Sequence, residues 1–170
     1  MSCEFLCGNF PKAANIRCYN LTVDGTYTGP SPGAPITGSW TPSLLFNTSS
    51  TGITYSVPPT GTYVSTGNIV FIQGSMQLSS LGSFSGDAIP TIAGLPFPVG
   101  ASVIPTNLSC TWGNCPLDTN ATTVTAHSVP ASSTLTLNMT YSTGTAEVAL
   151  YNMFMSNTSV INFSGFYFTS

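Results

Sequence analysis

Side chains that could act as catalytic acids or bases are few in this sequence and lie far apart. The carboxylates are Glu4, Asp24, Asp87, Asp118 and Glu147. Most glycosidases use two carboxyl groups that flank the bond they cleave, and no two of these residues are close enough in sequence to indicate such a pair. The sequence therefore disfavours glycoside hydrolysis.

His127 is the single histidine, so any nucleophile of the serine or cysteine type would depend on it as a base. Its neighbours Ala126 and Ser128 match no nucleophile or base signature. We interpret His127 as a loop or interface residue, and we predict that the protein is not an enzyme.

Five cysteines are present, and an odd number leaves at least one thiol unpaired or paired between chains. Cys110 and Cys115 have the spacing of a small disulfide loop. Two free thiols in a reducing cytoplasm are the alternative, and the sequence does not decide between them. A structural zinc site needs four ligands, and with one histidine and no CxxC pair we predict no metal and no cofactor.

Trp112 lies between these two cysteines, in a segment rich in Gly, Asn and Cys that we interpret as a loop. An exposed aromatic ring there would stack on a sugar or on a partner's surface. The alternative is a ring that folds onto its own domain or onto a neighbouring copy. Trp40, which opens the first expected strand, is predicted to lie in the core.

Charged residues make up only 4% of the chain, against about 25% in a typical globular domain. Ser, Thr, Asn and Gly fill the polar positions, and a surface of hydroxyls and amides suits contacts with other chains or with sugars. The basic residues are Lys12 and Arg17, so residues 18–170 cannot neutralise phosphates and nucleic-acid binding is disfavoured. We also expect no membrane span and no Sec-type export, because neither an 18-residue apolar window nor a signal-peptide pattern occurs.

Alternation of apolar and polar residues with a period of two is the main structural signal. It is strongest over Val70–Leu78 and Leu135–Tyr141, and Gly67–Asn68 supplies a turn before the first of these. Strands separated by turn residues at about ten-residue spacing are typical of sandwiches and barrels. We predict an all-β protein, an antiparallel β-sandwich of jelly-roll-like type.

Other expected elements are less regular. They are a first strand over Trp40–Phe46, a short strand at Ile53–Tyr55, a turn at Pro58–Gly61, a strand over Asp87–Ile92, one or two long loops over residues 99–131 with short strands near Val103–Ile104 and Val124, a strand running into a single turn over Val148–Met155, and a β-bulge at Ser164–Gly165.

The N-terminal 37 residues differ from the rest and are predicted to form an anchoring arm with a Pro/Gly-rich linker, leaving residues 38–170 as the β-sandwich domain. The apolar side chains of the arm cannot form a core of their own, so we expect them to bury against a partner, with two basic residues beside them. The expected partner-binding residues are Phe5, Leu6, Phe10, Lys12, Ile16 and Arg17.

Several short motifs follow one another in a familiar order. They are GSWTPSL from Gly38, GITYS from Gly52, GTY from Gly61, GNIV from Gly67, GLPF from Gly94 and FSGFY from Phe163. Over about residues 38–170 this succession resembles a β domain that recurs in structural proteins of tailed bacteriophages, often at the C-terminal end of tail fibres and other virion-surface proteins. The resemblance implies an antiparallel sandwich on the outside of a virion, commonly oligomeric, with no catalytic residues to carry over.

The segment Cys110–Cys115 is not part of that pattern, and no fibre shaft precedes the domain in this sequence. We therefore expect a capsid decoration (cement) or head-fibre protein, assembled in the host cytoplasm onto the outer surface of the virion. Its partner would be the major capsid protein or another virion protein. The alternative is a tail-associated receptor-binding domain that contacts host surface glycan. A cell-surface carbohydrate-binding module is disfavoured because no export signal is visible.

Two stretches, Ile69–Ile72 and Phe163–Phe168, are apolar on both strand faces. A single small sandwich buries one face of each sheet, so these stretches predict a homo-oligomer. We favour a trimer over a dimer, because fibre-like β domains often trimerise.

Overall fold

Strands dominate the structure, a computed structural model that describes residues 34–84, 87–142 and 147–169, all of them within one unit, Gly33–Ser170. The strands within these ranges are β1 Ile36–Trp40, β2 Ser43–Phe46, β3 Ile53–Thr66, β4 Ile69–Leu81, β5 Pro90–Ala93, β6 Asn107–Gly113, β7 Ala121–Ser128, β8 Thr134–Tyr141, β9 Val148–Ala149 and β10 Val160–Phe168. A 3-10 turn, η1 Asn152–Phe154, lies between β9 and β10.

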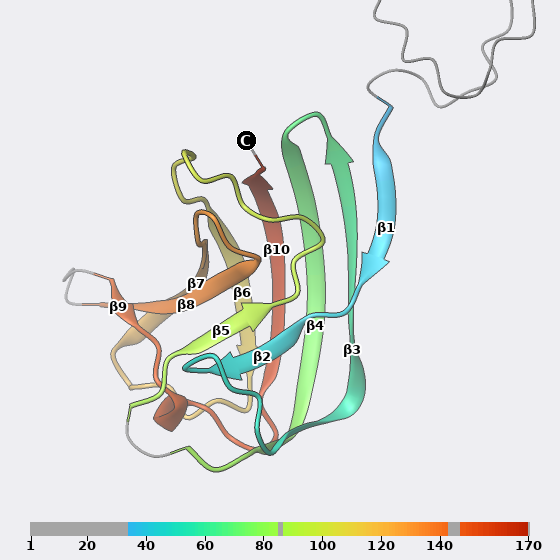
Figure 1. Cartoon of the computed structure of the whole chain (residues 1–170). Coiled ribbons are helices and arrows are strands. Elements are labelled where there is room, and N and C mark those ends of the chain that lie inside the picture. The colour runs from blue at the N-terminus through green and yellow to red at the C-terminus, as the bar shows by residue number, and fades with distance from the viewer. Residues whose placement is uncertain (1–33, 85–86, 143–146, 170) are drawn as a thin grey trace, which may run out of the picture. The chain divides into compact units, whose positions relative to one another are not determined.

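All the strands join one antiparallel sheet in the order β1-β3-β4-β10-β6-β7-β8-β5-β2, with β9 paired to β8. In Figure 1 strands β1, β3, β4 and β10 run upright, and β2, β5 and β8 cross them. The all-β antiparallel fold predicted from the sequence is confirmed. The strands form a single sheet that curls into a half-barrel around one core, and the jelly-roll type stays a prediction.

The curl of the sheet is clearest from strands β1 and β2. They follow each other in the chain but lie at opposite ends of the strand order. Trp40 pairs with Gly61 of β3, whereas Ser43 pairs with Ala93 of β5. Only Thr41 and the buried Pro42 separate them, and proline has no N–H to lose from a ladder. The expected single strand Trp40–Phe46 is therefore two strands, which join the two edges of the sheet.

Inward-facing residues alternate with outward-facing ones as the sequence predicted, most cleanly along β4, β8 and β10. They belong to one hydrophobic cluster. Its largest fully buried side chains are Phe46, Leu44, Met76, Leu78, Ile92, Leu108, Leu135, Leu137, Met139, Leu150, Ile161 and Tyr167.

Two interior glycines make room for aromatic rings. Gly61 and Gly74 face each other across β3 and β4. A Cβ atom on Gly61 would lie 2.4 Å from Nε1 of Trp40, and one on Gly74 would lie 2.4 Å from Cζ of Phe163. The two rings meet edge to face, with centroids 5.8 Å apart. Only glycine fits here, because the rings lie directly on the strand backbone.

Two sequence expectations, one about β3 and one about the region of β6 and β7, are wrong at least in part. Pro58–Gly61 is not a turn, because β3 continues through it, with register shifts between Thr54 and Thr60 that relieve the ladder where the prolines stand. Residues 99–131 contain two strands, β6 and β7, rather than mostly loops; the short strand expected near Val124 is present as part of β7, whereas Val103–Ile104 is not a strand. Few large apolar side chains alternate there, so the period-two signal was weak.

The expected bulge at Ser164–Gly165 is also absent, since β10 pairs with β4 without a register shift. Gly165 keeps its inward position, where a Cβ atom would lie 2.8 Å from Cγ of Leu108. The glycine therefore reflects close packing rather than a change of phase. By contrast, residues 148–155 form a strand and a single turn, as predicted.

Both ends of the sheet domain lie beside the β3–β4 turn at Gly67–Asn68. Ile36, the first residue of β1, pairs with Ser65, and the N–H of Thr169 donates to the carbonyl oxygen of Asn68 at 2.9 Å. Figure 1 shows the C-terminus and the start of β1 at this same end. The chain therefore enters and leaves the domain at one pole.

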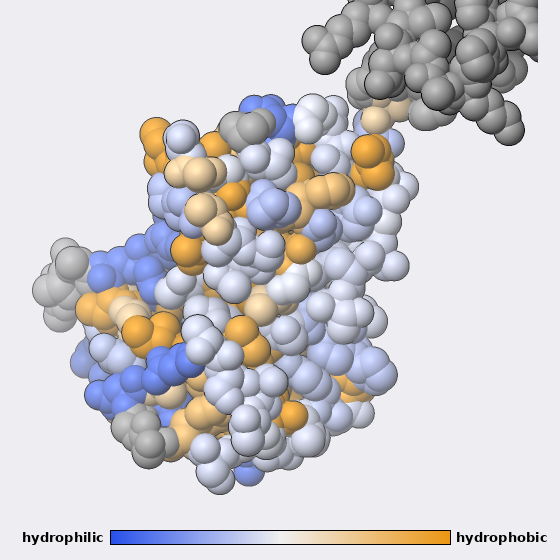
Figure 2. Space-filling view, viewed as in Figure 1, coloured by the Kyte–Doolittle hydropathy of each residue, from blue (hydrophilic) through white to orange (hydrophobic). Residues whose placement is uncertain are grey.

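The surface of the described residues is almost uncharged. It has three carboxylates, on Asp87, Asp118 and Glu147, and no lysine or arginine. The face shown in Figure 2 is mostly pale, with few strongly hydrophilic side chains. No helix in the described ranges is both long and apolar enough to span a bilayer.

Candidate functional site

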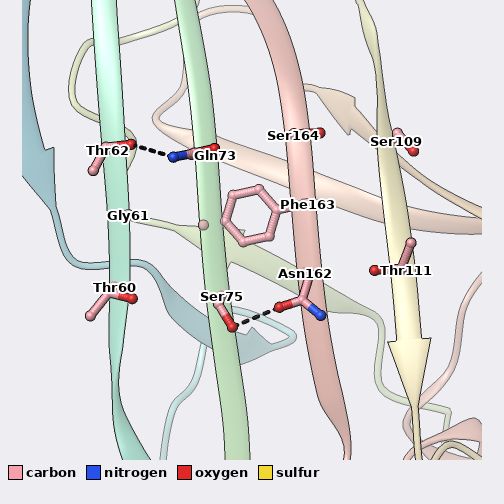
Figure 3. A pocket seen from close by; sticks show the side chains of 11 residues that line it. Thr60, Gly61, Thr62, Gln73, Ser75, Ser109, Thr111, Asn162, Phe163 and Ser164 are labelled. Atoms are coloured by element: carbon pink, nitrogen blue, oxygen red, sulfur yellow. Dashed lines mark hydrogen bonds between the residues drawn. The ribbon is translucent and has the colours of Figure 1, made fainter.

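Polar side chains form two rows on the outer face of the sheet half made by β3, β4, β10 and β6. The strand register places them opposite one another, because residues of one parity share a face. One row contains Thr62, Gln73, Ser164 and Ser109, and the other contains Thr60, Ser75, Asn162 and Thr111. Figure 3 shows the two rows across the four strands.

A third row on the same face is apolar. Val64, Phe71 and Phe166 stand opposite one another on β3, β4 and β10. Their exposed fractions are 39%, 48% and 40%, and the rings of Phe71 and Phe166 are 5.9 Å apart between centroids. The sequence predicted that both faces would be covered here, but within one chain this face is open.

The rows enclose two adjoining depressions, which together we call the outer groove. The polar rows line a hollow of about 390 Å³, and the apolar row borders one of about 440 Å³. Thr62, Gln73 and Ser164 line both hollows, so the outer groove is continuous. Each volume is within the range of about 300–1,000 Å³ that ligand sites occupy.

Two hydrogen bonds join four side chains of the outer groove, and other polar atoms there are left open. Nε2 of Gln73 donates to Oγ1 of Thr62 at 3.0 Å, and Oγ of Ser75 donates to Oδ1 of Asn162 at 2.7 Å. The second amide atom of each long side chain, Oε1 of Gln73 and Nδ2 of Asn162, has no partner among the described residues. The same is true of the Ser164 hydroxyl. No lining residue is charged, so the outer groove offers donors and acceptors to a neutral polar ligand.

A second cluster lies outside the groove, on β7 and before β9. The Thr125 hydroxyl donates to Oε1 of Glu147, which also lies 2.6 Å from Nε2 of His127. Burial acts to raise the pKa of Glu147, but hydrogen bonds from Thr125, His127 and Asn138 and the charge of His127 outweigh it, so the pKa is lowered.

This cluster does not form a catalytic relay. Thr125 and Glu147 both contact Nε2 of His127, whereas a triad needs its nucleophile and its acid on different ring nitrogens. No group of three or more His, Cys, Asp or Glu that could hold a metal ion occurs in the described ranges. The contacts instead tie the start of β9 to β7.

Trp112 lies in β6, opposite Ile161 of β10, and not in a loop. Its half-buried ring packs against the core, and its Nε1 is buried without a hydrogen-bond partner. This is the second of the two alternatives for Trp112. The strand continues to Gly113, so the turn residues that suggested a loop come after the tryptophan rather than around it.

Cys110 and Cys115 are both free thiols, the second alternative that the sequence left open. The two thiols have different neighbours, because Cys115 contacts Ser159 whereas Cys110 pairs with Phe163, four residues further along the chain. Burial raises the pKa of Cys110 to about 12. The Cys115 thiol lies 3.1 Å from the Ser159 hydroxyl, and burial raises its pKa too.

The expected arm residues Phe5, Leu6, Phe10, Lys12, Ile16 and Arg17 lie outside the described residues. The outer groove, in contrast, was not predicted. The polar parity of β4 was visible in the sequence, but its match with β10 and β6, about 90 and 40 residues further on, depends on the register.

No protein-family model matches this sequence, and no curated protein is significantly similar to it. Among solved structures, the chain is similar to the crystal structure of the Dettilon tailspike protein, with a TM-score of 0.64 and 26% sequence identity. The match covers 78% of this chain and 23% of the tailspike chain, so this chain spans about a quarter of its length. The similarity supports a β-rich structural protein of a phage virion.

Proposed function

We propose that this chain forms a tail-associated receptor-binding domain of a phage virion, and that the outer groove is its contact with host surface glycan. The observation that supports the proposal is the outer groove itself, which combines open amide and hydroxyl groups with exposed aromatic rings on one rigid sheet. Sites built on strands hold their side chains in place better than sites on loops.

The chemistry of the outer groove suits sugars. Sugar hydroxyls both donate and accept, as do the side chains of Gln73, Asn162 and Ser164. The apolar face of a sugar ring packs well on an aromatic side chain, and Phe71 and Phe166 adjoin the polar rows. The groove has no carboxylate or histidine to act as acid or base, so we propose binding without catalysis at this site.

Attachment to a capsid is the interpretation that we favour less. It depends on the expected arm residues Phe5 to Arg17, which lie outside the described residues, and no described feature adds support to it. The similarity to a tailspike favours a tail location.

Two measurements test the proposal on virions that contain this chain. Antibody against the chain, viewed by electron microscopy, should label the tail. The purified protein should compete with the virions for host cells and slow their adsorption, and the double variant Gln73→Ala/Asn162→Ala should compete less well. Labelling of the head, with no effect of the purified protein on adsorption, would refute the proposal.

A further inference from the structure

The outer groove has no charged side chain among its lining residues. The described residues include no lysine or arginine, and the one histidine among them, His127, contacts Glu147 on the other half of the sheet. From this we infer that the outer groove selects neutral oligosaccharides and rejects anionic ones. The inference rests on the proposed function and names the ligand class of that site.

An anionic sugar would lose favourable hydration free energy on entering the outer groove, and contacts with the groove would not compensate for that loss. A carboxylate, sulfate or phosphate in a protein site is usually held by Arg or Lys, or by free backbone N–H groups. Neither basic side chain occurs here, and the groove floor is paired sheet, in which β4 has hydrogen-bonded neighbours on both sides. An anion moved into the outer groove would therefore be desolvated without compensation.

Neutral sugars find matching hydrogen-bonding groups in both polar rows. Oε1 of Gln73 can accept, Nδ2 of Asn162 can donate, and the hydroxyls of Ser109, Thr111 and Ser164 can do either. The three rows are two residues apart along each strand, so they span about 14 Å. That length exceeds one sugar ring, which favours an oligosaccharide whose rings contact the polar rows and then Phe166.

A second copy of this chain is the rival occupant of the same face. Serine is depleted at protein–protein interfaces, whereas hydroxyl and amide side chains form two of the three rows here. Hydroxyl groups buried against a second copy without partners would weaken that association. The observations therefore favour a sugar, and self-association becomes an outcome of the test.

The test uses the full chain on an array of microbial oligosaccharides that includes neutral members and members with uronate, sialate or phosphate groups. We expect binding to neutral members only. Binding should be nearly unchanged between 50 and 500 mM NaCl, because screening weakens only charged contacts.

Variants then locate the site. Gln73→Ala and Asn162→Ala should each weaken binding to the neutral glycan by about tenfold, the size of one lost hydrogen bond in a desolvated site. Gln77→Ala is the matched control, because Gln77 is on β4 with the same outward parity but does not line the groove. It should bind like the wild type. Ser164→Lys should reduce neutral binding and introduce binding to anionic members. Circular dichroism checks that each variant is folded.

Several results would overturn the inference. They are a preference of the wild type for anionic members, equal affinities of the Gln73→Ala, Asn162→Ala and Gln77→Ala variants, or no array binding by a protein that sediments as an oligomer and dissociates on Phe166→Ser. If the protein blocks adsorption to host cells but binds no neutral glycan, this inference fails and the proposed function stands. If the groove binds neutral glycan but antibody labels the head, only the proposed function fails.

Discussion

Gly74 is predicted to be one of the least replaceable residues of the sheet, although it lies beneath the exposed groove. In Gly74→Ala the new Cβ would meet three atoms of the Phe163 ring at 2.4, 2.9 and 3.0 Å. Ordinary contact begins near 3.4 Å, so the ring must move. It is 3% exposed and packs against Trp40, which leaves little space for that movement.

The expected cost follows from two opposing effects. Overpacking a core costs about 1–3 kcal/mol, and the clash here is severe enough for the upper part of that range. Replacing a strand glycine by alanine stabilises the fold by about 0.5–1 kcal/mol, because the unfolded chain then has less conformational entropy to lose. We expect a net loss of about 2 kcal/mol in the free energy of unfolding, and a melting temperature lower by about 4–8 °C for a chain of this size.

Thermal and urea unfolding measure this effect, and Gly113→Ala is the control. A Cβ at Gly113 would lie 3.5 Å from Val160, an ordinary contact, so that variant should be neutral or more stable by about 0.4–1 kcal/mol. Phe163→Leu should partly rescue Gly74→Ala, with a coupling of about 1 kcal/mol. The reasoning is refuted if Gly74→Ala is as stable as Gly113→Ala, or if the double variant is strictly additive.

Three further predictions concern buried or paired groups. Because the pKa of Glu147 is lower in the folded chain, its carboxylate stabilises the fold above pH 4.5 and loses that contribution as the pH falls through the lower folded pKa; Glu147→Gln should therefore melt earlier than the wild type at pH 6, with a difference that shrinks as the pH is lowered below 4.5, and a difference that does not change with pH would argue against this carboxylate. Cys110, whose pKa is raised to about 12, should resist iodoacetamide at pH 8 until the chain is unfolded, as peptide mapping by mass spectrometry will show; rapid labelling of the native protein would contradict the burial. Tyr167→Phe removes a hydroxyl that donates to the carbonyl oxygen of Phe97 at 2.9 Å and accepts from its N–H at 3.2 Å, so urea unfolding should show a loss of about 1–3 kcal/mol, and an unchanged midpoint would mean that water replaces the hydroxyl.

The strands that the sequence predicted best are those with one face buried in the core and the other facing solvent. β8, with Leu135, Leu137 and Met139 inward, was predicted to its last residue, because local alternation alone identifies such a strand. β6 has Leu108 as its only fully buried apolar side chain, so its partners rather than its own sequence determine that it is a strand.

What sequence reasoning missed depends on long-range pairing. The switch between β1 and β2 at Thr41–Pro42 cannot be recognised without knowing that the sheet curls, and the tight fit of Phe163 on Gly74 joins residues far apart in the chain. The outer groove needs three registers at once, those of β4 with β3 and β10, and of β10 with β6. The oligomeric state stays a prediction.

The common pole at which the chain enters β1 and leaves β10 bears on how such a domain is used. Three strand spacings, from β1 across β3 and β4 to β10, separate Ile36 from Phe168 by about 14 Å. A segment whose ends lie so close can be inserted into another polypeptide without separating the two residues that flank the insertion. The positions of its two ends therefore permit the half-barrel to be inserted into a longer chain while the strand pairing that forms the outer groove stays intact.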